Sequence, residues 1–135
     1  MRTIDFRGKA VGSGRWIHGD LVWNGRTPAI FEDANQENGC ITVKESTLGM
    51  NTGAKDKQGH EIYEGDILKH TNMPVYYTVV WSVELCSYVL YNSKETHGDF
   101  GFDELSPMGR MLRLFPFNIV GNIFDNPEVV KGVVI

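Results

Sequence analysis

The chain carries an acidic cluster, Glu61, Glu64 and Asp66, that could take part in chemistry. Two neighbouring carboxylates can act as a general acid and base, or can bind a hard cation. Side chains two residues apart point to the same face of a strand, so Glu64 and Asp66 could form such a pair. The competing interpretation is structural, because an Asp that follows a Gly accepts backbone N–H groups in turns. We favour the structural interpretation and predict no catalytic residue.

The histidines do not form a local metal-binding motif. The four of them are His18, His60, His70 and His97. No two have the i, i+2 or i, i+4 spacing that places two ligands on one element, and the cysteines add no C-x2-C pair. The sequence therefore predicts no metal site and no cofactor, and the histidines are expected to lie exposed in loops or strands.

The two cysteines, Cys40 and Cys86, each lie in an apolar or aromatic stretch. Free cysteine behaves as a small buried hydrophobe, so both are predicted to be buried thiols. A disulfide would need an oxidising compartment, and the charged start M-R-T-I-D-F-R lacks the apolar core of a signal peptide. No apolar run approaches the roughly 20 residues of a membrane helix. We therefore expect the cytoplasm of a bacterial cell and no membrane partner.

Aromatic side chains are the main candidates for an interaction surface. On alternating strands some of them must face outward, where they can anchor a partner or stack on bases. The candidate surface residues are Trp16, Trp23, Tyr63, Tyr76, Trp81 and Tyr88. Most aromatic side chains are still expected in the core. The 17 acidic and 13 basic residues give a net charge of −4, which disfavours nucleic acid and favours a protein partner or self-association.

The backbone is organised around residues 52–69, T-G-A-K-D-K-Q-G-H-E-I-Y-E-G-D-I-L-K. Gly59 is predicted to adopt a positive φ in a turn, because a residue without a Cβ reaches that conformation most easily. The Gly65-Asp66 step is predicted to bulge or sharply bend the strand that contains Ile62 and Leu68. Asn24-Gly25 is a strong signal for a β-hairpin.

The rest of the chain is rich in short β-type segments. Strands are expected at residues 75–83, 85–91 and 116–124, a loop at 93–99, and a last short helix or turn at 125–128. Residues 100–105 could be a strand or a helical turn, and 110–114 are ambiguous. No run of about 12 residues has the spacing of an amphipathic helix. The predicted class is all-β or mainly β, with short bent strands in a small barrel- or sandwich-like body and at most short helices.

Several blocks resemble the YopX family of phage and prophage proteins. They are I-D-F-R-G-K, G-R-W-I-H-G-D-L-V, V-K-E-S-T-L-G-M-N-T-G, K-D-K-Q-G-H-E-I-Y-E-G-D-I-L and V-G-N-I-F-D-N-P-E. Residues 56–66 follow the family pattern D-x-x-G-x-x-I-Y-E-G-D. Met50-Asn51 departs from it, because family members often carry Gln and an aromatic residue there. The matching positions, expected to be structural, are Asp56, Gly59, Ile62, Tyr63, Glu64, Gly65, Asp66, Gly121 and Asn122.

The resemblance implies a β-rich fold without an accepted activity, and it supplies no catalytic residues. We expect a single domain over residues 1–135, or two subdomains of about 1–48 and 49–135. The favoured function is a non-enzymatic binding or self-associating module, whose partner is a second copy or a phage or host protein. The alternatives are a β-barrel that binds single-stranded nucleic acid, and an enzyme that uses Glu64 and Asp66.

Overall fold

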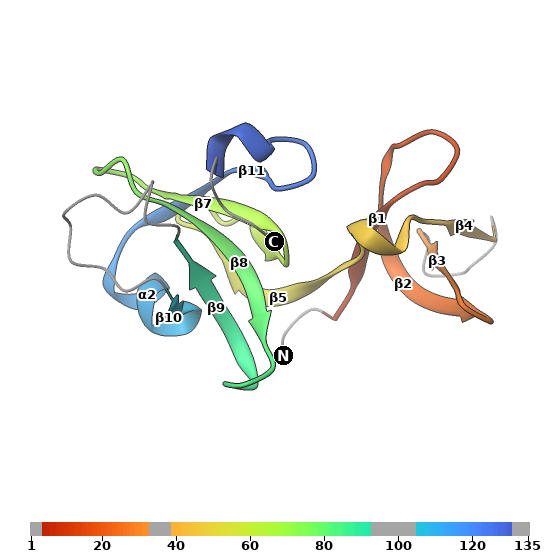
Figure 1. Ribbon diagram of the computed structural model, residues 1–135, viewed down its shortest axis with the longest axis horizontal. Helices are drawn as coiled ribbons and strands as arrows, with labels where there is room; N and C mark the ends of the chain where they lie inside the picture. The colour runs from red at the N-terminus through yellow and green to blue at the C-terminus, as the bar shows by residue number, and fades with distance from the viewer. Residues whose placement is uncertain (1–3, 33–38, 93–104, 131–135) are drawn as a thin grey trace. The chain divides into compact units, whose positions relative to one another are not determined.

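The computed structural model describes residues 4–32, 39–92 and 105–130 of the chain. The described part is mainly β with short helices, which confirms the predicted fold class (Figure 1). Its strands form open antiparallel sheets in the orders β4-β3-β2-β1-β5-β6 and β10-β9-β8-β7-β11, without a closed barrel. The elements are β1 (Phe6–Lys9), β2 (Trp16–Asn24), β3 (Thr27–Phe31), β4 (Cys40–Thr42), the 3-10 helix η1 (Glu45–Thr47), β5 (Gly49–Lys55), β6 (Glu61–Tyr63), β7 (Asp66–His70), β8 (Tyr76–Ser82), β9 (Ser87–Tyr91), β10 (Leu105–Pro107), the helix α2 (Met108–Leu114), β11 (Phe117–Asn122) and the 3-10 helix η2 (Pro127–Val130).

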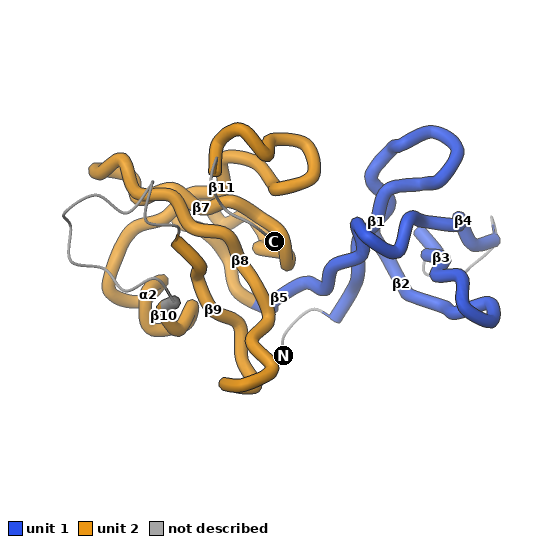
Figure 2. Tube along the Cα trace, in the orientation of Figure 1, with its two compact units in different colours: residues 1–53 blue, residues 54–135 orange. Residues whose placement is uncertain are grey.

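The chain divides into two compact units, residues 1–53 and residues 54–135 (Figure 2). The division lies five residues beyond the boundary near residue 48 that the sequence suggested. Strand β5 begins in unit 1 beside β1 and ends in unit 2. Each unit has its own cluster of buried apolar side chains.

Unit 1 is built on the long strand β2, which pairs with two neighbours in turn. Its first half pairs with β1 and its second half with β3. The change occurs at Gly19, where a Cβ would lie 1.9 Å from the carbonyl oxygen of Phe31. Only glycine permits this close approach of two backbones. The predicted hairpin at Asn24-Gly25 is confirmed, with Gly25 and Arg26 as the turn between β2 and β3.

The core of unit 1 is small. It contains Ala10, Ile17, Ile30 and Val43, all buried. Ala10 and Val43 also form an isolated bridge that brings the end of β4 back to the end of β1. This bridge curls the sheet around the four side chains.

Unit 2 contains the five-stranded sheet and most of the buried aromatic surface. Its core cluster includes Ile62, Leu68, Tyr77 and Phe117 from four different strands, with Met111 from α2. The rings of Tyr77 and Phe117 meet edge to face with centroids 5.6 Å apart. Such aromatic pairs stabilise a core beyond the area they bury.

The strand predictions in unit 2 are confirmed by β8, β9 and β11, and the short terminal element is confirmed by η2, which begins at Pro127. Residues 110–114, which the sequence left ambiguous, belong to α2. The expected loop at 93–99 and residues 100–104 lie outside the described residues.

Candidate functional site

The turn between β5 and β6 is held together by the carboxylate of Asp56. Its Oδ1 accepts the backbone N–H groups of Gln58 at 3.0 Å and His60 at 2.8 Å. Its Oδ2 accepts the N–H of Ile119 in β11 at 3.0 Å, which ties the turn to a strand 63 residues away. Gly59 has φ +87°, as predicted, and its N–H donates to the carbonyl of Asp56. The role of this turn is therefore mechanical: one buried carboxylate joins the end of the six-stranded sheet to β11 of the five-stranded sheet.

These hydrogen bonds also set the charge state of Asp56. Burial by itself would raise its pKa. The N–H groups of Ile119, His60 and Gln58, together with the His60 imidazole, outweigh burial, and the pKa lies below its ordinary value. Asp56 is therefore ionised at neutral pH, with its oxygens already engaged inside the fold.

The second aspartate of the pattern, Asp66, has a similar role. Asp66 is only 2% exposed, and its Oδ2 accepts the N–H of Tyr63 at 2.7 Å. Glu64 is half-buried and accepts the Tyr88 hydroxyl at 3.3 Å, whereas Glu61 is exposed. The three acids of the sequence cluster thus lie in different environments. Asp66 accepts a backbone N–H group at the turn, as the structural interpretation of the sequence predicted.

Gly65 forms the predicted sharp bend, with φ +89°, as part of a turn that separates β6 from β7. A Cβ at this position would lie 2.9 Å from the ring of Phe124. Its N–H donates to the carbonyl of Val79, and its carbonyl accepts the N–H of Ile123. Gly65 thus allows three segments of unit 2 to approach closely.

Gly121 and Asn122 end β11, where the pairing with β7 shifts by one residue. A Cβ at Gly121 would lie 2.5 Å from Asn126 Oδ1. Asn122 Oδ1 accepts the backbone N–H groups of Phe124 at 3.0 Å and Asp125 at 2.9 Å. These two residues therefore shape the turn that leads to η2.

The predicted surface aromatics are divided between the two units. Trp23 is 46% exposed in unit 1, and Trp16 is half-buried under two cations. The Arg7 Cζ lies 4.8 Å and the Lys9 Nζ 5.5 Å from the centroid of the Trp16 ring. These distances are within the range of cation–π interactions.

In unit 2, Tyr63 is buried with 6% exposure and is removed from the candidate surface. Its strand, β6, points it inward, which the sequence pattern alone could not show. Tyr76 and Tyr88 are half-buried, and Trp81 is 47% exposed. The rings of Trp81 and Tyr88 meet edge to face on the β8–β9 hairpin, with centroids 5.0 Å apart.

The β8–β9 hairpin also exposes apolar residues that the search for aromatic residues missed. Val83 is 80% exposed and Leu85 is 55% exposed in the turn between the strands. The turn is closed by the N–H of Leu85, which donates to Ser82 Oγ at 3.1 Å. The sequence V-E-L-C at residues 83–86 could have indicated this exposure, because apolar residues at the tip of a hairpin lie too far from the core to be buried. We call Trp81, Val83, Leu85 and Tyr88 the hairpin patch.

The prediction that both cysteines are buried is wrong. Cys40 and Cys86 are free thiols on the surface. Cys86 lies in the turn of the β8–β9 hairpin with φ +50°, and Cys40 begins β4 at the end of the unit 1 sheet. Burial depends on the position of a residue in the sheet, and both positions are peripheral.

The prediction of exposed histidines is wrong for His70. It is buried between the rings of Phe115 and Phe117, at centroid distances of 5.9 and 5.6 Å. Its Nδ1 accepts the N–H of Asn72 at 3.1 Å. Burial lowers its pKa, and the charge of Lys69 lowers it further. His18 and His60 are exposed, and His97 lies outside the described residues.

Within the described ranges, no group of three His, Cys, Asp or Glu side chains could hold a metal ion. None of the described helices has both the length and the apolar character needed to cross a membrane.

Comparisons with known proteins agree with the fold. The family model for YopX protein matches residues 5–131. The chain is also similar to the crystal structure of protein EF1440 from Enterococcus faecalis, with 19% sequence identity and a TM-score of 0.59 over 97% of this chain and 100% of that chain. Comparison with curated proteins gave no match. Because the family match spans nearly the whole sequence, the chain belongs to the YopX protein family.

Proposed function

We propose that this protein is a non-catalytic binding module that self-associates through the hairpin patch. The observation that carries the proposal is the grouping of Trp81, Val83 and Leu85 on one hairpin with 47%, 80% and 55% exposure. Contiguous exposed apolar groups are uncommon on monomeric proteins and mark interaction sites. The resemblance to phage and prophage proteins supports a role in the cytoplasm of a bacterial host.

The geometry of the hairpin favours one continuous face. Trp81 pairs directly with Tyr88 across the two strands, so their side chains lie on the same face of the sheet. The turn beyond them adds Val83 and Leu85, with Glu84 as the single charged residue of the turn. In a dimer with a two-fold axis through this hairpin, the apolar residues of one copy would pack against the same residues of the other copy, without a large charge repulsion.

The expected affinity is modest. Fully burying one large apolar side chain contributes roughly 1.5–3 kcal/mol, so the exposed parts of three such side chains in two copies contribute about 5–11 kcal/mol. Association costs at least about 4 kcal/mol in lost freedom of motion. The surplus is at most about 7 kcal/mol, which corresponds to a Kd of about 10 µM at the strong limit. The proposal requires a Kd no weaker than about 1 mM, equivalent to a surplus of roughly 4 kcal/mol.

Sedimentation velocity over a range from about 10 µM to 1 mM tests the proposal, since this range spans the expected Kd. A reducing agent is needed because Cys40 and Cys86 are exposed thiols. Wild-type protein should show concentration-dependent dimers, and the double variant Val83→Ser/Leu85→Ser should lose them. The control, Val11→Ser/Val120→Ser, changes two exposed valines that do not belong to this hairpin and should behave as wild type.

A wild type that stays monomeric over the whole range overturns the proposal, and so does a control that dissociates as readily as the hairpin variant. Thermal unfolding of both variants shows whether any loss reflects unfolding. If the wild type remains monomeric and retains a phage or host protein, the chain is a binding module for that partner. This outcome contradicts self-association.

A second candidate function is the binding of single-stranded nucleic acid by unit 1. Lys9 pairs with Trp16 across β1 and β2, which places a half-buried lysine and an aromatic ring on one face, whereas the neighbouring Arg7 is buried. Such a face suits a phosphate backbone with stacked bases. Unit 1 contains equal numbers of acidic and basic residues, so the chain's charge of −4 lies in unit 2.

Fluorescence anisotropy with a labelled oligothymidylate at low salt tests this second candidate. Binding should weaken as salt rises, and Lys9→Glu should reduce it more than Lys44→Glu, which changes an exposed lysine outside this pairing. No salt-dependent binding, or equal effects of the two variants, would exclude it.

A further inference from the structure

A cavity in unit 2 has the composition of a ligand site independent of the hairpin patch. We propose that it binds a carboxylate attached to an apolar body, as in an aromatic or branched organic acid. The cavity has a volume of about 300 Å³ and lies between the β5–β6 turn and the segment that joins α2 to β11. This volume is at the lower end of the range for ligand pockets, with room for one ring or branched chain.

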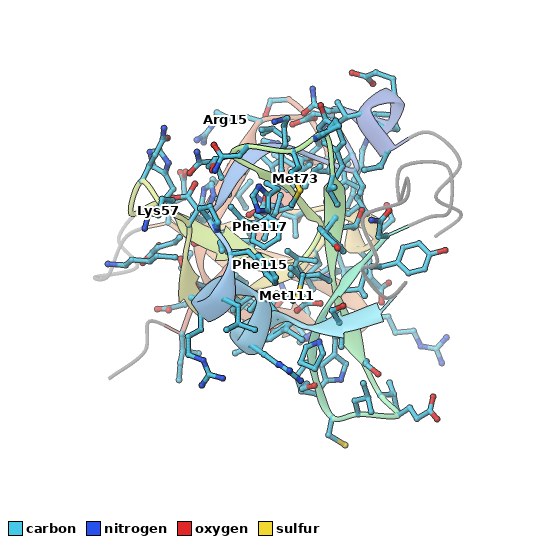
Figure 3. The ribbon with its side chains drawn as sticks, turned by 90° about the vertical axis from the view of Figure 1, so that its left-hand side faces the viewer. Arg15, Lys57, Met73, Met111, Phe115 and Phe117 are labelled. Carbon is cyan, nitrogen blue, oxygen red and sulfur yellow. The ribbon has the colours of Figure 1, made fainter. Side chains whose placement is uncertain are left out.

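Apolar side chains from the end of α2 and the following segment form part of the cavity lining and are firmly supported. Leu112, Phe115 and Pro116 line it, together with the buried Phe117. Figure 3 shows Phe115 and Phe117 close together between Met73 and Met111, and all four belong to the same packed cluster. The carbonyl of Phe117 accepts the N–H of Lys57 at 2.9 Å, which holds the turn against β11. The cavity is therefore shaped before any ligand arrives.

The rim of the cavity carries positive charge. Lys55 and Lys57 come from the turn and Arg113 comes from α2, and all three are exposed. The one acid in the lining, Asp56, is buried, and its oxygens accept backbone N–H groups inside the fold. Unit 2 carries 11 acidic and 7 basic residues, so a rim with three cations stands out against its surroundings.

These features together select the class of ligand. A guanidinium group fits a carboxylate through two parallel hydrogen bonds, and lysines add charge without a fixed geometry. The exposed Leu114, with 54% exposure, adds apolar surface at the mouth that an apolar ligand would cover. The same chemistry is found in a free organic acid and in an acidic peptide side chain beside an aromatic residue.

Arg113 also has a structural explanation that the test must separate from binding. It lies in the last turn of α2, where a cation interacts favourably with the helix dipole. A purely structural role would change the stability of unit 2 without changing the preference for a charged ligand. The charge preference is therefore the decisive measurement.

The test is an NMR titration of the full chain with 3-phenylpropionate. Two matched probes separate its parts: 3-phenylpropanamide keeps the ring and lacks the charge, and acetate keeps the charge and lacks the ring. A Kd of roughly 1–5 mM is expected for a ligand this small, with the two matched probes several-fold weaker. The largest shifts should occur at the amides of Lys57, Arg113 and Phe115. The pair Ac-Phe-Glu-NH₂ and Ac-Phe-Gln-NH₂ then shows whether a peptide can supply the same group.

Variants at the rim complete the experiment. Arg113→Gln and Lys57→Gln should each weaken the binding of phenylpropionate roughly three- to tenfold and leave the weak binding of the amide unchanged. Arg110→Gln, which changes an exposed residue of the same helix outside the cavity lining, should have no effect. Equal affinity for the acid and the amide, equal effects of the two arginine variants, or no shifts at these amides would overturn the proposal.

Discussion

The substitution Asp56→Asn tests the central structural element of the chain at almost constant shape. The carboxylate accepts three backbone N–H groups, two on Oδ1 and one on Oδ2. An amide keeps one oxygen, which can still accept the N–H groups of Gln58 and His60. Its NH₂ group then faces the N–H of Ile119, so two donors meet and neither has an acceptor there.

The expected cost follows from these contacts. Leaving one buried N–H without an acceptor costs about 1–3 kcal/mol, and the two remaining hydrogen bonds lose the strength that the charge supplied. The free energy of unfolding should therefore fall by about 2–4 kcal/mol. With an m-value of about 1–3 kcal/mol per molar, the urea midpoint should fall by roughly 1–2 M.

Urea unfolding followed by circular dichroism measures this loss, with Glu61→Gln as the control, since Glu61 is exposed on the adjoining strand. The pH dependence gives a second check. The pKa of Asp56 is lowered in the folded chain, so its contribution is complete above its ordinary value and is lost as pH falls through the lowered pKa. The difference in free energy of unfolding between wild type and Asp56→Asn should therefore become smaller in this acidic range. Equal urea midpoints for the two variants would refute the role of Asp56 in joining the turn to β11.

Three further predictions follow from single positions. The pKa of His70 is lowered in the folded chain, so the free energy of unfolding should increase as pH rises toward 6.5, the ordinary pKa of histidine, and should level off above it. Urea titrations of His70→Gln at several pH values should show no such increase. Gly59→Ala should lower the free energy of unfolding by about 1–2 kcal/mol because the φ of residue 59 is positive. Gly65→Ala should lower the melting temperature more than Gly59→Ala does, because its Cβ would also meet Phe124. Equal losses in the two variants would contradict the close approach of Gly65 to Phe124. Cys40 and Cys86 should both react with a thiol reagent in the native protein at the rate of the unfolded chain, and slow reaction would contradict their exposure.

Local backbone chemistry was the most predictable part of the fold. Gly59 and the Asn24-Gly25 hairpin follow from φ preferences of single residues, and Pro127 begins η2 for the same reason. The helix α2 was not predicted, because seven residues that include Gly109 give too short a pattern to separate a helix from a strand.

Burial was the least predictable part. Tyr63 and His70 are buried although Glu64 and Lys69 stand next to them in the sequence, whereas Cys86 and Leu85 are exposed although they precede the strand β9. Their positions depend on which strand lies beside them and on where each hairpin ends. Of the residues proposed for the surface, Trp81 is exposed and Tyr63 is buried, and the proposal did not include the exposed hairpin tip at Val83 and Leu85.

The sequence by itself determined the mainly β class, the places where the chain turns, and the family to which it belongs, because these depend on residue types at short spacing. The tertiary structure decided which acids are used up inside the fold and which apolar groups face solvent. Asp56 illustrates the reason, since its third donor, Ile119, lies 63 residues away and reaches it only when β11 is in place. The cavity below Lys57 and Arg113 likewise exists only because distant segments meet there.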